Sequence, residues 1–151
     1  MKLVSLSWSH RSSSSAAREA LALVPIERVL AELKARGFSE AAAVSTCNRF
    51  ELYAAGTPAA APSAGPLLAA LEELAGAALG ADAEIRQDAV SVGHLFCVAA
   101  GLDSLVVGET EILGQVKSGY ELAKAAGMTG KRLNVLFQRA LFVGKKVRTE
   151  T

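Results

Sequence analysis

A cysteine and an arginine lie two residues apart in the segment Thr46-Cys47-Asn48-Arg49, between two short apolar stretches. Cysteine is nucleophilic as its thiolate, and a nearby cation stabilises that form. The planar guanidinium of arginine binds a carboxylate through two parallel hydrogen bonds, which lysine does less well. This spacing is typical either of a nucleophile beside a carboxylate clamp, or of a packed cysteine beside a solvated arginine that pairs weakly with Glu51.

The surroundings of the two cysteines differ. Polar residues flank Cys47 at the end of a predicted strand, where functional groups often gather. Cys97 stands inside the apolar run AVSVGHLFCVAA, and we expect it in the core. Two cysteines make no disulfide framework, so we expect both thiols to be free in a reducing, cytoplasmic setting.

His94 is the second candidate catalytic residue. It lies at helical spacing from Val90, Cys97 and Val98, which predicts a core histidine with one backbone partner. In a cleft it would instead act as a general acid or base, or orient a substrate. A tetrahedral metal site would need both histidines and both cysteines of the chain to converge, and we expect none.

A third polar group follows in the stretch GLDSLVVGETEILGQ, which runs from 101 to 115. As structural residues, its members would cap a turn and favour the start of the next helix through the helix dipole. As functional residues, they would line a site that reads an ammonium or a hydroxyl. The sequence contains neither G-x-x-x-x-G-K-[ST] nor a G-x-G-x-x-G after a predicted strand, so it offers no nucleotide-binding motif of its own. The polar residues of the stretch are Asp103, Ser104, Glu109, Glu111 and Gln115.

The elements that position these residues follow from the hydrophobic pattern. Strands are predicted at 2–8, 41–46, 50–54 and 84–87. Helices are predicted at 16–24, 26–36, 67–79, 89–100, 110–126 and 131–149. The strands on either side of the TCNR segment are expected to be antiparallel. The order predicts an α+β fold, with a small antiparallel β-sheet covered by helices.

Composition and charge bound the class of protein. The chain has 151 residues, of which 51% are hydrophobic, and its net charge is +1. It is therefore long enough to bury a core, and its overall charge is too small to attract a polyanion. No apolar run approaches the roughly 18 residues of a membrane span, and the amino terminus is too short and polar for a signal peptide.

The last predicted helix is amphipathic. Basic residues cover most of its outer surface, and no glycine, asparagine or proline marks its end. We therefore expect its apolar stripe either to pack on a part of the protein outside this sequence or to continue as a longer helix. Its apolar stripe consists of Leu133, Leu136, Phe137, Ala140, Leu141, Gly144 and Val147.

Together these segments resemble the N-terminal catalytic domain of glutamyl-tRNA reductases. The shared stretches are STCNRFELY, HLFCVAAGLDSLVVGETEILGQVKSGYELA and LFQRALFVGKKVRTET, in order along most of the chain. The family's opening motif, roughly G-x-N-H-[KR]-T-A-P, reads SWSHRSSS here and keeps His10 and Arg11. Its G-E-P-Q reads G-E-T-E. The resemblance implies a catalytic domain over 1–130 and the start of a long linker (spinal) helix over 131–151.

The resemblance also implies a reaction. The family uses NADPH to reduce the glutamate of glutamyl-tRNA to glutamate-1-semialdehyde, at the start of tetrapyrrole (porphyrin) biosynthesis. Cys47 would form a thioester with the glutamyl group, and His94 would serve in positioning or proton transfer. Arg49 would clamp the γ-carboxylate and so discriminate against glutamine. The substrate-binding residues that the resemblance implies are Thr46, Asn48, Arg49, Ser104, Glu109, Thr110, Glu111 and Gln115.

Beyond the site, the resemblance implies glutamyl-tRNA as partner and NADPH held by a domain outside this sequence. It further implies a homodimer for the longer protein and contact with the next enzyme of the pathway. Without the NADPH-binding domain, the chain is expected to acylate and hydrolyse but not to reduce. Two other classes stay open: a non-catalytic interaction module in which Cys47 is merely packed, and a different cysteine acyltransferase that acts on a carrier thioester.

Overall fold

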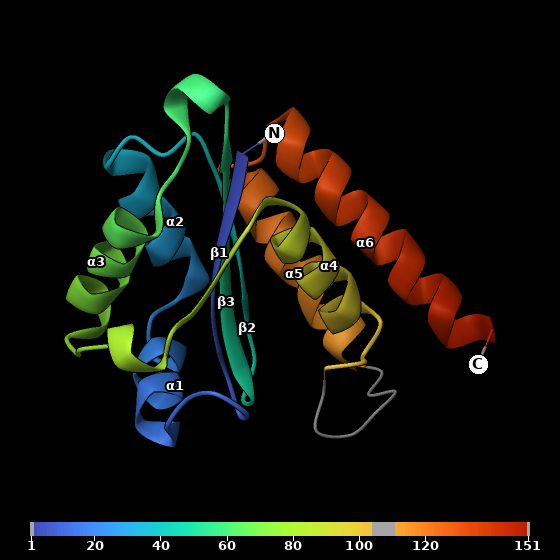
Figure 1. Ribbon diagram of the computed structural model, residues 1–151, viewed down its shortest axis with the longest axis horizontal. Helices are drawn as coiled ribbons and strands as arrows, with labels where there is room; N and C mark the ends of the chain where they lie inside the picture. Colours follow the sequence, from blue (N-terminus) through green and yellow to red (C-terminus); the bar gives the residue numbers. More distant parts are fainter. Residues whose placement is uncertain (1, 104–110, 151) are drawn as a thin grey trace.

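A four-stranded antiparallel sheet lies between two groups of helices (Figure 1). The computed structural model describes residues 2–103 and 111–150. The strands are β1 (Lys2–Ser9), β2 (Glu40–Ser45), β3 (Arg49–Gly56) and β4 (Glu84–Gln87), in the order β2-β3-β1-β4. This arrangement confirms the predicted α+β class and the antiparallel pairing around the TCNR segment.

Helices cover both faces of the sheet, three on each side in the described part of the chain (Figure 1). On one side lie α1 (Ser15–Ala22), α2 (Ile26–Ala35) and α3 (Ala64–Ala75). On the other lie α4 (Asp88–Ala99), α5 (Glu111–Ala125) and α6 (Lys131–Glu150). Single turns of 3₁₀ helix, at Pro58–Ala60 and Gly80–Asp82, flank α3. Five of the predicted helices match within two residues at each end, whereas α3 begins three residues and ends four residues earlier than predicted. The predicted boundary between domains at 130 stays a prediction.

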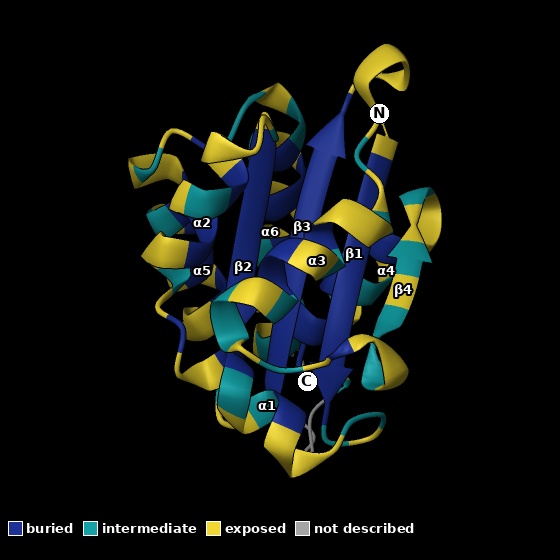
Figure 2. Ribbon diagram, turned by 90° about the vertical axis from the view of Figure 1, so that its left-hand side faces the viewer, coloured by how far each residue is buried: buried dark blue, intermediate teal, exposed yellow. Residues whose placement is uncertain are grey.

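The central strands β1 and β3 bury both of their faces (Figure 2). Because successive side chains of a strand point to opposite faces, each strand contributes alternately to two layers. Toward α1–α3 the layer is apolar: Trp8 and Phe50 pack with ring centroids 6.1 Å apart, and the indole of Trp8 donates to the carbonyl of Leu79 at 3.0 Å. Toward α4–α6 the layer is polar, with Ser5 hydrogen-bonded to Ser91 of α4 at 2.9 Å.

Two glycines bring the helices of the second layer close to their neighbours. A Cβ atom on Gly119 of α5 would lie 2.2 Å from the carbonyl oxygen of Ala43 in β2, and one on Gly144 of α6 would lie 2.7 Å from that of Ala99 in α4. The predicted apolar stripe of α6 faces inward, and its Phe137 packs against the rings of Tyr53 and Tyr120. These close contacts fix α4–α6 over the polar layer of the sheet.

The prediction that Cys97 lies in the core is wrong, because its side chain is exposed. Helix α4 is apolar on nearly every side, but only the positions that face the sheet and α6 are buried, such as Leu95 and Val98. Val90, one of the expected packing neighbours of His94, is 65% exposed. An apolar composition therefore did not reveal which side of this helix faces outward. Within the described ranges, no helix is long and apolar enough to cross a membrane.

Candidate active site

The turn that joins β2 to β3 presents Cys47. Thr46 Oγ1 accepts hydrogen bonds from the backbone N–H groups of Asn48 and Arg49, each at 3.2 Å. The N–H of Thr46 donates to the carbonyl of Arg49, and the N–H of His10 donates to that of Asn48. Because both ends of this turn are tied down while the Cys47 side chain is exposed, the thiol stands at a fixed, accessible position.

Arg49 follows this turn as the first residue of β3, and it is only 2% exposed. Its Nη1 donates to Glu51 Oε2 and to Asp103 Oδ2, each at 3.0 Å. Its Nη2 donates to the backbone carbonyl of Asp103 at 2.5 Å. Burial by itself lowers the pKa of Arg49, but the charge of Glu51 and the hydrogen bond to Asp103 outweigh that effect and raise the pKa. The predicted pair with Glu51 is thus present, but it is buried rather than a weak surface contact.

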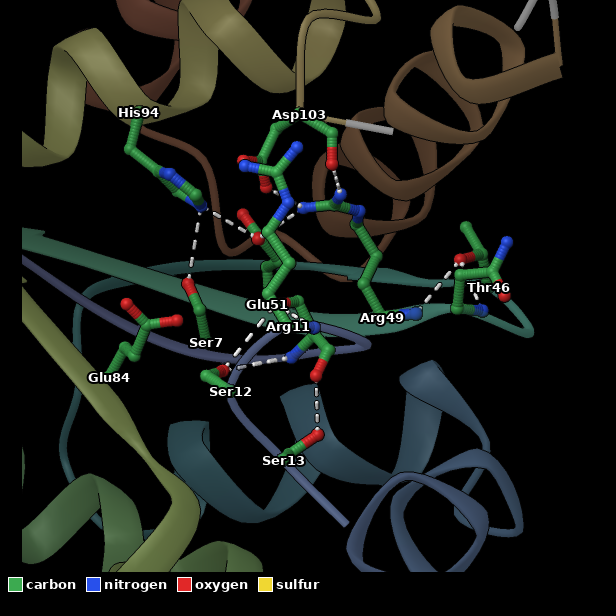
Figure 3. A network of polar contacts seen from close by, with 12 residues as sticks. Ser7, Arg11, Ser12, Ser13, Thr46, Arg49, Glu51, Glu84, His94 and Asp103 are labelled. Carbon is green, nitrogen blue, oxygen red and sulfur yellow. Dashed lines mark hydrogen bonds and ion pairs between the residues drawn. The ribbon is translucent and has the colours of Figure 1, made fainter. Parts of the chain in front are cut away.

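Glu51 is the centre of the network in Figure 3 and has no exposed surface. Its carboxylate accepts hydrogen bonds from three side chains: Arg49, the hydroxyl of Tyr53 at 2.5 Å, and Nε2 of His94 at 2.8 Å. Burial raises the pKa of Glu51, but the hydrogen bond and charge of His94, followed by Arg49 and Tyr53, lower it below its ordinary value. Glu51 is therefore an ionised carboxylate that three donors hold in place.

His94 reaches this carboxylate from α4. Its Nε2 lies 2.8 Å from Glu51 Oε2 and 3.4 Å from the hydroxyl of Ser7, and its side chain is 10% exposed. The expectation of a core histidine with a backbone partner is wrong, because the histidine turns toward a polar layer rather than an apolar one. Arg86 of β4 extends the network by donating to Ser7 at 3.2 Å.

Asp103, which follows α4 in the chain, completes the network. Besides its contacts with Arg49, its Oδ1 lies 3.4 Å from a guanidinium nitrogen of Arg11. His10 lies in the same loop after β1, and its Nδ1 is buried without a hydrogen-bond partner among the described residues. Burial, then the charges of Arg49 and Arg11, lower the pKa of His10. Three segments that are distant in sequence therefore meet at Arg49.

The predicted site residues fall into three groups. Arg49 and His94 are joined through Glu51, and Thr46, Cys47 and Asn48 form the adjoining turn. Glu111 and Gln115 are exposed on α5. Ser104, Glu109 and Thr110 lie outside the described residues. Their roles stay predictions.

Sequence reasoning underrated two residues of this network and missed a third. Glu51 was expected only as a weak partner of Arg49, and Asp103 as a turn cap or a lining residue. Tyr53 was not singled out. The signal was present, because positions 49, 51 and 53 alternate along a strand and so share one face.

The arrangement fits acyl chemistry better than cofactor binding. An accessible thiol on a tied turn can attack an activated acyl group, and a buried guanidinium two residues along the chain can hold an anionic substrate group. Sites of the Rossmann type for a nicotinamide dinucleotide lie at the carboxyl ends of parallel strands. Every strand pairing of this sheet is antiparallel in the described part of the chain, so these residues do not fit such a cofactor.

Comparisons with known proteins agree with each other. The family model described as "Glutamyl-tRNAGlu reductase, N-terminal domain" matches residues 6–151. The glutamyl-tRNA reductases of Marinobacter nauticus and Salinispora arenicola are each 45% identical over 100% of this chain, which covers 36% and 34% of their lengths. The solved glutamyl-tRNA reductase from Methanopyrus kandleri matches with a TM-score of 0.81 and 34% identity, over 99% of this chain and 35% of that one. The chain thus spans about a third of the length of these relatives.

Proposed function

Because the chain belongs to the family of glutamyl-tRNA reductase N-terminal domains, we propose that it transfers the glutamyl group of glutamyl-tRNA onto Cys47. The observation that carries the proposal is the pairing of an exposed thiol, on a tied turn, with a buried arginine two residues away. The first group suits attack on an acyl ester, and the second suits recognition of the glutamate side chain.

The acyl transfer starts from the thiolate of Cys47. Its sulfur attacks the carbonyl carbon of the aminoacyl ester, a C–S bond forms, and the C–O bond to the tRNA ribose breaks. The ribose oxygen leaves as a hydroxyl after it takes up a proton. His94 serves in positioning or in this proton transfer, and its hydrogen bond to Glu51 supports either role by fixing the imidazole.

Arg49 selects the substrate in this proposal. Its guanidinium would donate two parallel hydrogen bonds to the γ-carboxylate of glutamate, whereas the amide of glutamine offers a single oxygen acceptor. Glu51 supports the selection because it holds Arg49 in one orientation at 3.0 Å. Thr46 and Asn48 shape the turn next to the nucleophile, and the remaining predicted contacts with the substrate come from the segment after Asp103 and from α5.

The later chemistry belongs to a longer protein. Bound by a further domain, NADPH supplies the hydride that converts the acyl group to glutamate-1-semialdehyde for tetrapyrrole synthesis. We assign only acyl transfer and hydrolysis to the residues present here. A homodimer, contact with the next enzyme of the pathway and a cytoplasmic location belong to the same proposal for the longer protein.

Intact-protein mass spectrometry after incubation with glutamyl-tRNA tests the proposal. The chain offers a matched control, because Cys47 and Cys97 are both exposed free thiols. We expect a glutamyl adduct that hydroxylamine removes, present in the wild type and in Cys97→Ser but absent from Cys47→Ser. Glutaminyl-tRNA should give little or no adduct.

Loss of the adduct with rapid deacylation that needs Cys47 would mean that the thioester forms and water hydrolyses it. An adduct that maps to Cys97, or one that survives Cys47→Ser, would contradict the proposal. If neither adduct nor deacylation occurs, the measurement is repeated with the longer protein. Failure there as well would favour the non-catalytic interaction module, and equal reaction with glutamyl esters of other carriers would favour a different acyltransferase.

A further inference from the structure

We propose that Asp103 occupies the binding fork of Arg49 with its side-chain carboxylate and its backbone carbonyl, and that a ligand carboxylate binds by replacing both contacts, with Arg11 as a second cationic donor. The inference deepens the proposed function and rests on it for the identity of the ligand as the glutamyl side chain. The carboxylate site itself is inferred from the contacts of the described residues.

Asp103 meets Arg49 in the manner of a bidentate ligand. One terminal nitrogen of the guanidinium donates to Asp103 Oδ2 at 3.0 Å, and the other donates to the backbone carbonyl of the same residue at 2.5 Å. Two donors side by side are what a carboxylate takes from an arginine fork. The fork that would hold a ligand carboxylate is therefore already filled by one residue of the chain (Figure 3).

Arg11 approaches the other oxygen of the same carboxylate. Its Nη1 lies 3.4 Å from Asp103 Oδ1, and its side chain is 58% exposed. The Asp103 carboxylate thus lies between one buried guanidinium and one exposed guanidinium. A ligand that entered from solvent would meet Arg11 on its way to Arg49.

The charges around Arg49 explain why a ligand carboxylate would replace the carboxylate of Asp103. Arg49 and Arg11 carry two positive charges, and Glu51 and Asp103 carry two negative ones, so these four side chains are balanced. A further carboxylate would meet no unpaired cation among the four. If it takes the place of Asp103, the balance is kept.

The environments of Glu51 and Asp103 indicate which of the two carboxylates a ligand can replace. Glu51 has no exposed surface and is held by Arg49, His94 and Tyr53. The side chain of Asp103 is 22% exposed, and both of its side-chain contacts are with arginines. Water can solvate the Asp103 carboxylate once it leaves the fork, whereas no such route is open to Glu51.

The exchange with Asp103 lowers the affinity for a ligand, and it increases the selectivity for a carboxylate over a neutral amide. A ligand carboxylate restores the charged contacts that it breaks, so the net change in free energy is small. A neutral amide cannot restore them, because it leaves the two guanidinium groups with one weaker acceptor. Asp103 therefore acts as a competitor that a carboxylate can displace and an amide cannot.

Binding of glutarate tests the proposal, with glutaramide as the neutral probe of the same length. Dissociation constants are measured from the ¹⁵N–¹H signals of the arginine side chains during titration. Asp103→Asn should bind glutarate roughly tenfold more tightly than the wild type, because a neutral amide competes less well for the fork. Arg11→Gln should bind it about threefold more weakly. Arg11→Gln should leave glutaramide binding unchanged, whereas Asp103→Asn should strengthen it, because the competitor that excludes an amide has gone.

The surface pair of Arg36 and Glu73, whose atoms lie 2.6 Å apart, provides matched controls. Arg36→Gln and Glu73→Gln change the same charges on another part of the molecule and should leave glutarate binding unchanged. If Asp103→Asn binds glutarate as weakly as the wild type or more weakly, Asp103 is only a structural support for Arg49 and the proposal is wrong. If Asp103→Asn does not fold, glutarate binding unchanged in Arg11→Gln would overturn it equally.

The two proposals can fail separately. A tighter site for glutarate in Asp103→Asn, together with no acylation of Cys47 by glutamyl-tRNA, would leave the carboxylate site standing and remove the proposed substrate. Acylation of Cys47 with glutarate binding that is insensitive to Asp103 would do the reverse. No binding of glutarate to any of the variants, at concentrations where glutaramide is also silent, would contradict the carboxylate site.

Discussion

The two faces of strands β1 and β3 are equally buried but are built from opposite kinds of side chain. Toward α1–α3 they carry Trp8, Phe50 and Leu52, which exclude water and need only to pack. Toward α4–α6 they carry serines, Arg49 and Glu51, each of which is buried with a hydrogen-bond partner. One pair of strands therefore supplies the core on one side and the candidate site on the other.

This difference has a consequence for how each face responds to change. An apolar face loses free energy in proportion to the volume removed, because its contacts are many and individually weak. A buried ionic face depends on complete pairing, because a charge without its partner is costly to keep out of water. The free energy of unfolding should therefore fall more sharply for single substitutions on the polar face than on the apolar one. Substitutions on the polar face should also affect the proposed chemistry.

The largest effect on stability is expected from Glu51→Gln. The change keeps the shape of the side chain but leaves Arg49 buried without one of its two carboxylates, and His94 without its anionic partner. We expect the free energy of unfolding to fall by about 3–5 kcal/mol, the size seen when one member of a buried pair is removed. Urea unfolding followed by circular dichroism measures it, and a loss below about 1 kcal/mol would contradict the importance of pairing.

A somewhat smaller loss is expected on the apolar face. Leu52→Ala removes a side chain with no exposed surface, and we expect roughly 3 kcal/mol from lost burial and a residual cavity. The dissociation constant for glutarate should stay as in the wild type, because Leu52 points away from Arg49. A parallel loss of glutarate binding would show that the two faces are not separable.

Tyr53→Phe removes one contact at the edge of the polar face and should destabilise the fold less than the two variants above. The hydroxyl donates to Glu51 Oε1, and its loss leaves a buried carboxylate with one donor fewer. We expect the free energy of unfolding to fall by about 1–2 kcal/mol. The same urea titration measures it, and an unchanged midpoint would mean that the other two donors are sufficient for Glu51.

The smallest effect is expected in the pH dependence of stability. The pKa of Glu51 is lowered in the folded chain, so its contribution is present above the ordinary value of 4.5 and is lost as the pH falls through the folded value. The pKa of His10 is lowered below 6.5, so stability should also decline as the pH falls below 6.5, where only the unfolded chain takes up that proton. Urea unfolding between pH 7 and 3 should show the decline that begins below pH 6.5 disappear in His10→Gln, and the decline at lower pH weaken in Glu51→Gln.

The fold was predictable because its elements have strong local signals. The alternation in β1 and the stripe of α6 were both evident in the pattern of apolar residues. The exposed side of α4 was not, because that helix is apolar all round and only tertiary packing decides which side is covered. Cys97 was placed in the core for this reason.

Three residues of the candidate site were singled out from the sequence, but their connections were not. Cys47, Arg49 and His94 stood out by residue type, and the resemblance to a family supplied their roles. The contacts that join Arg49 to Asp103 and Glu51 to His94 span 54 and 43 residues, and no local pattern encodes such pairs. Only tertiary packing, which places α4 and the residues after it over the sheet, brings them together.

The most direct test of the claim that the polar face selects the substrate is a ratio of two rates. Reaction of Cys47 with glutamyl-tRNA and with glutaminyl-tRNA is measured, as adduct plus released amino acid, in the wild type, Arg49→Lys and the surface control Arg36→Lys. We expect a ratio that strongly favours glutamyl-tRNA in the wild type and the control, and at least a roughly tenfold smaller ratio in Arg49→Lys, because lysine cannot form the bidentate contact. An unchanged ratio in Arg49→Lys would show that Arg49 does not read the carboxylate.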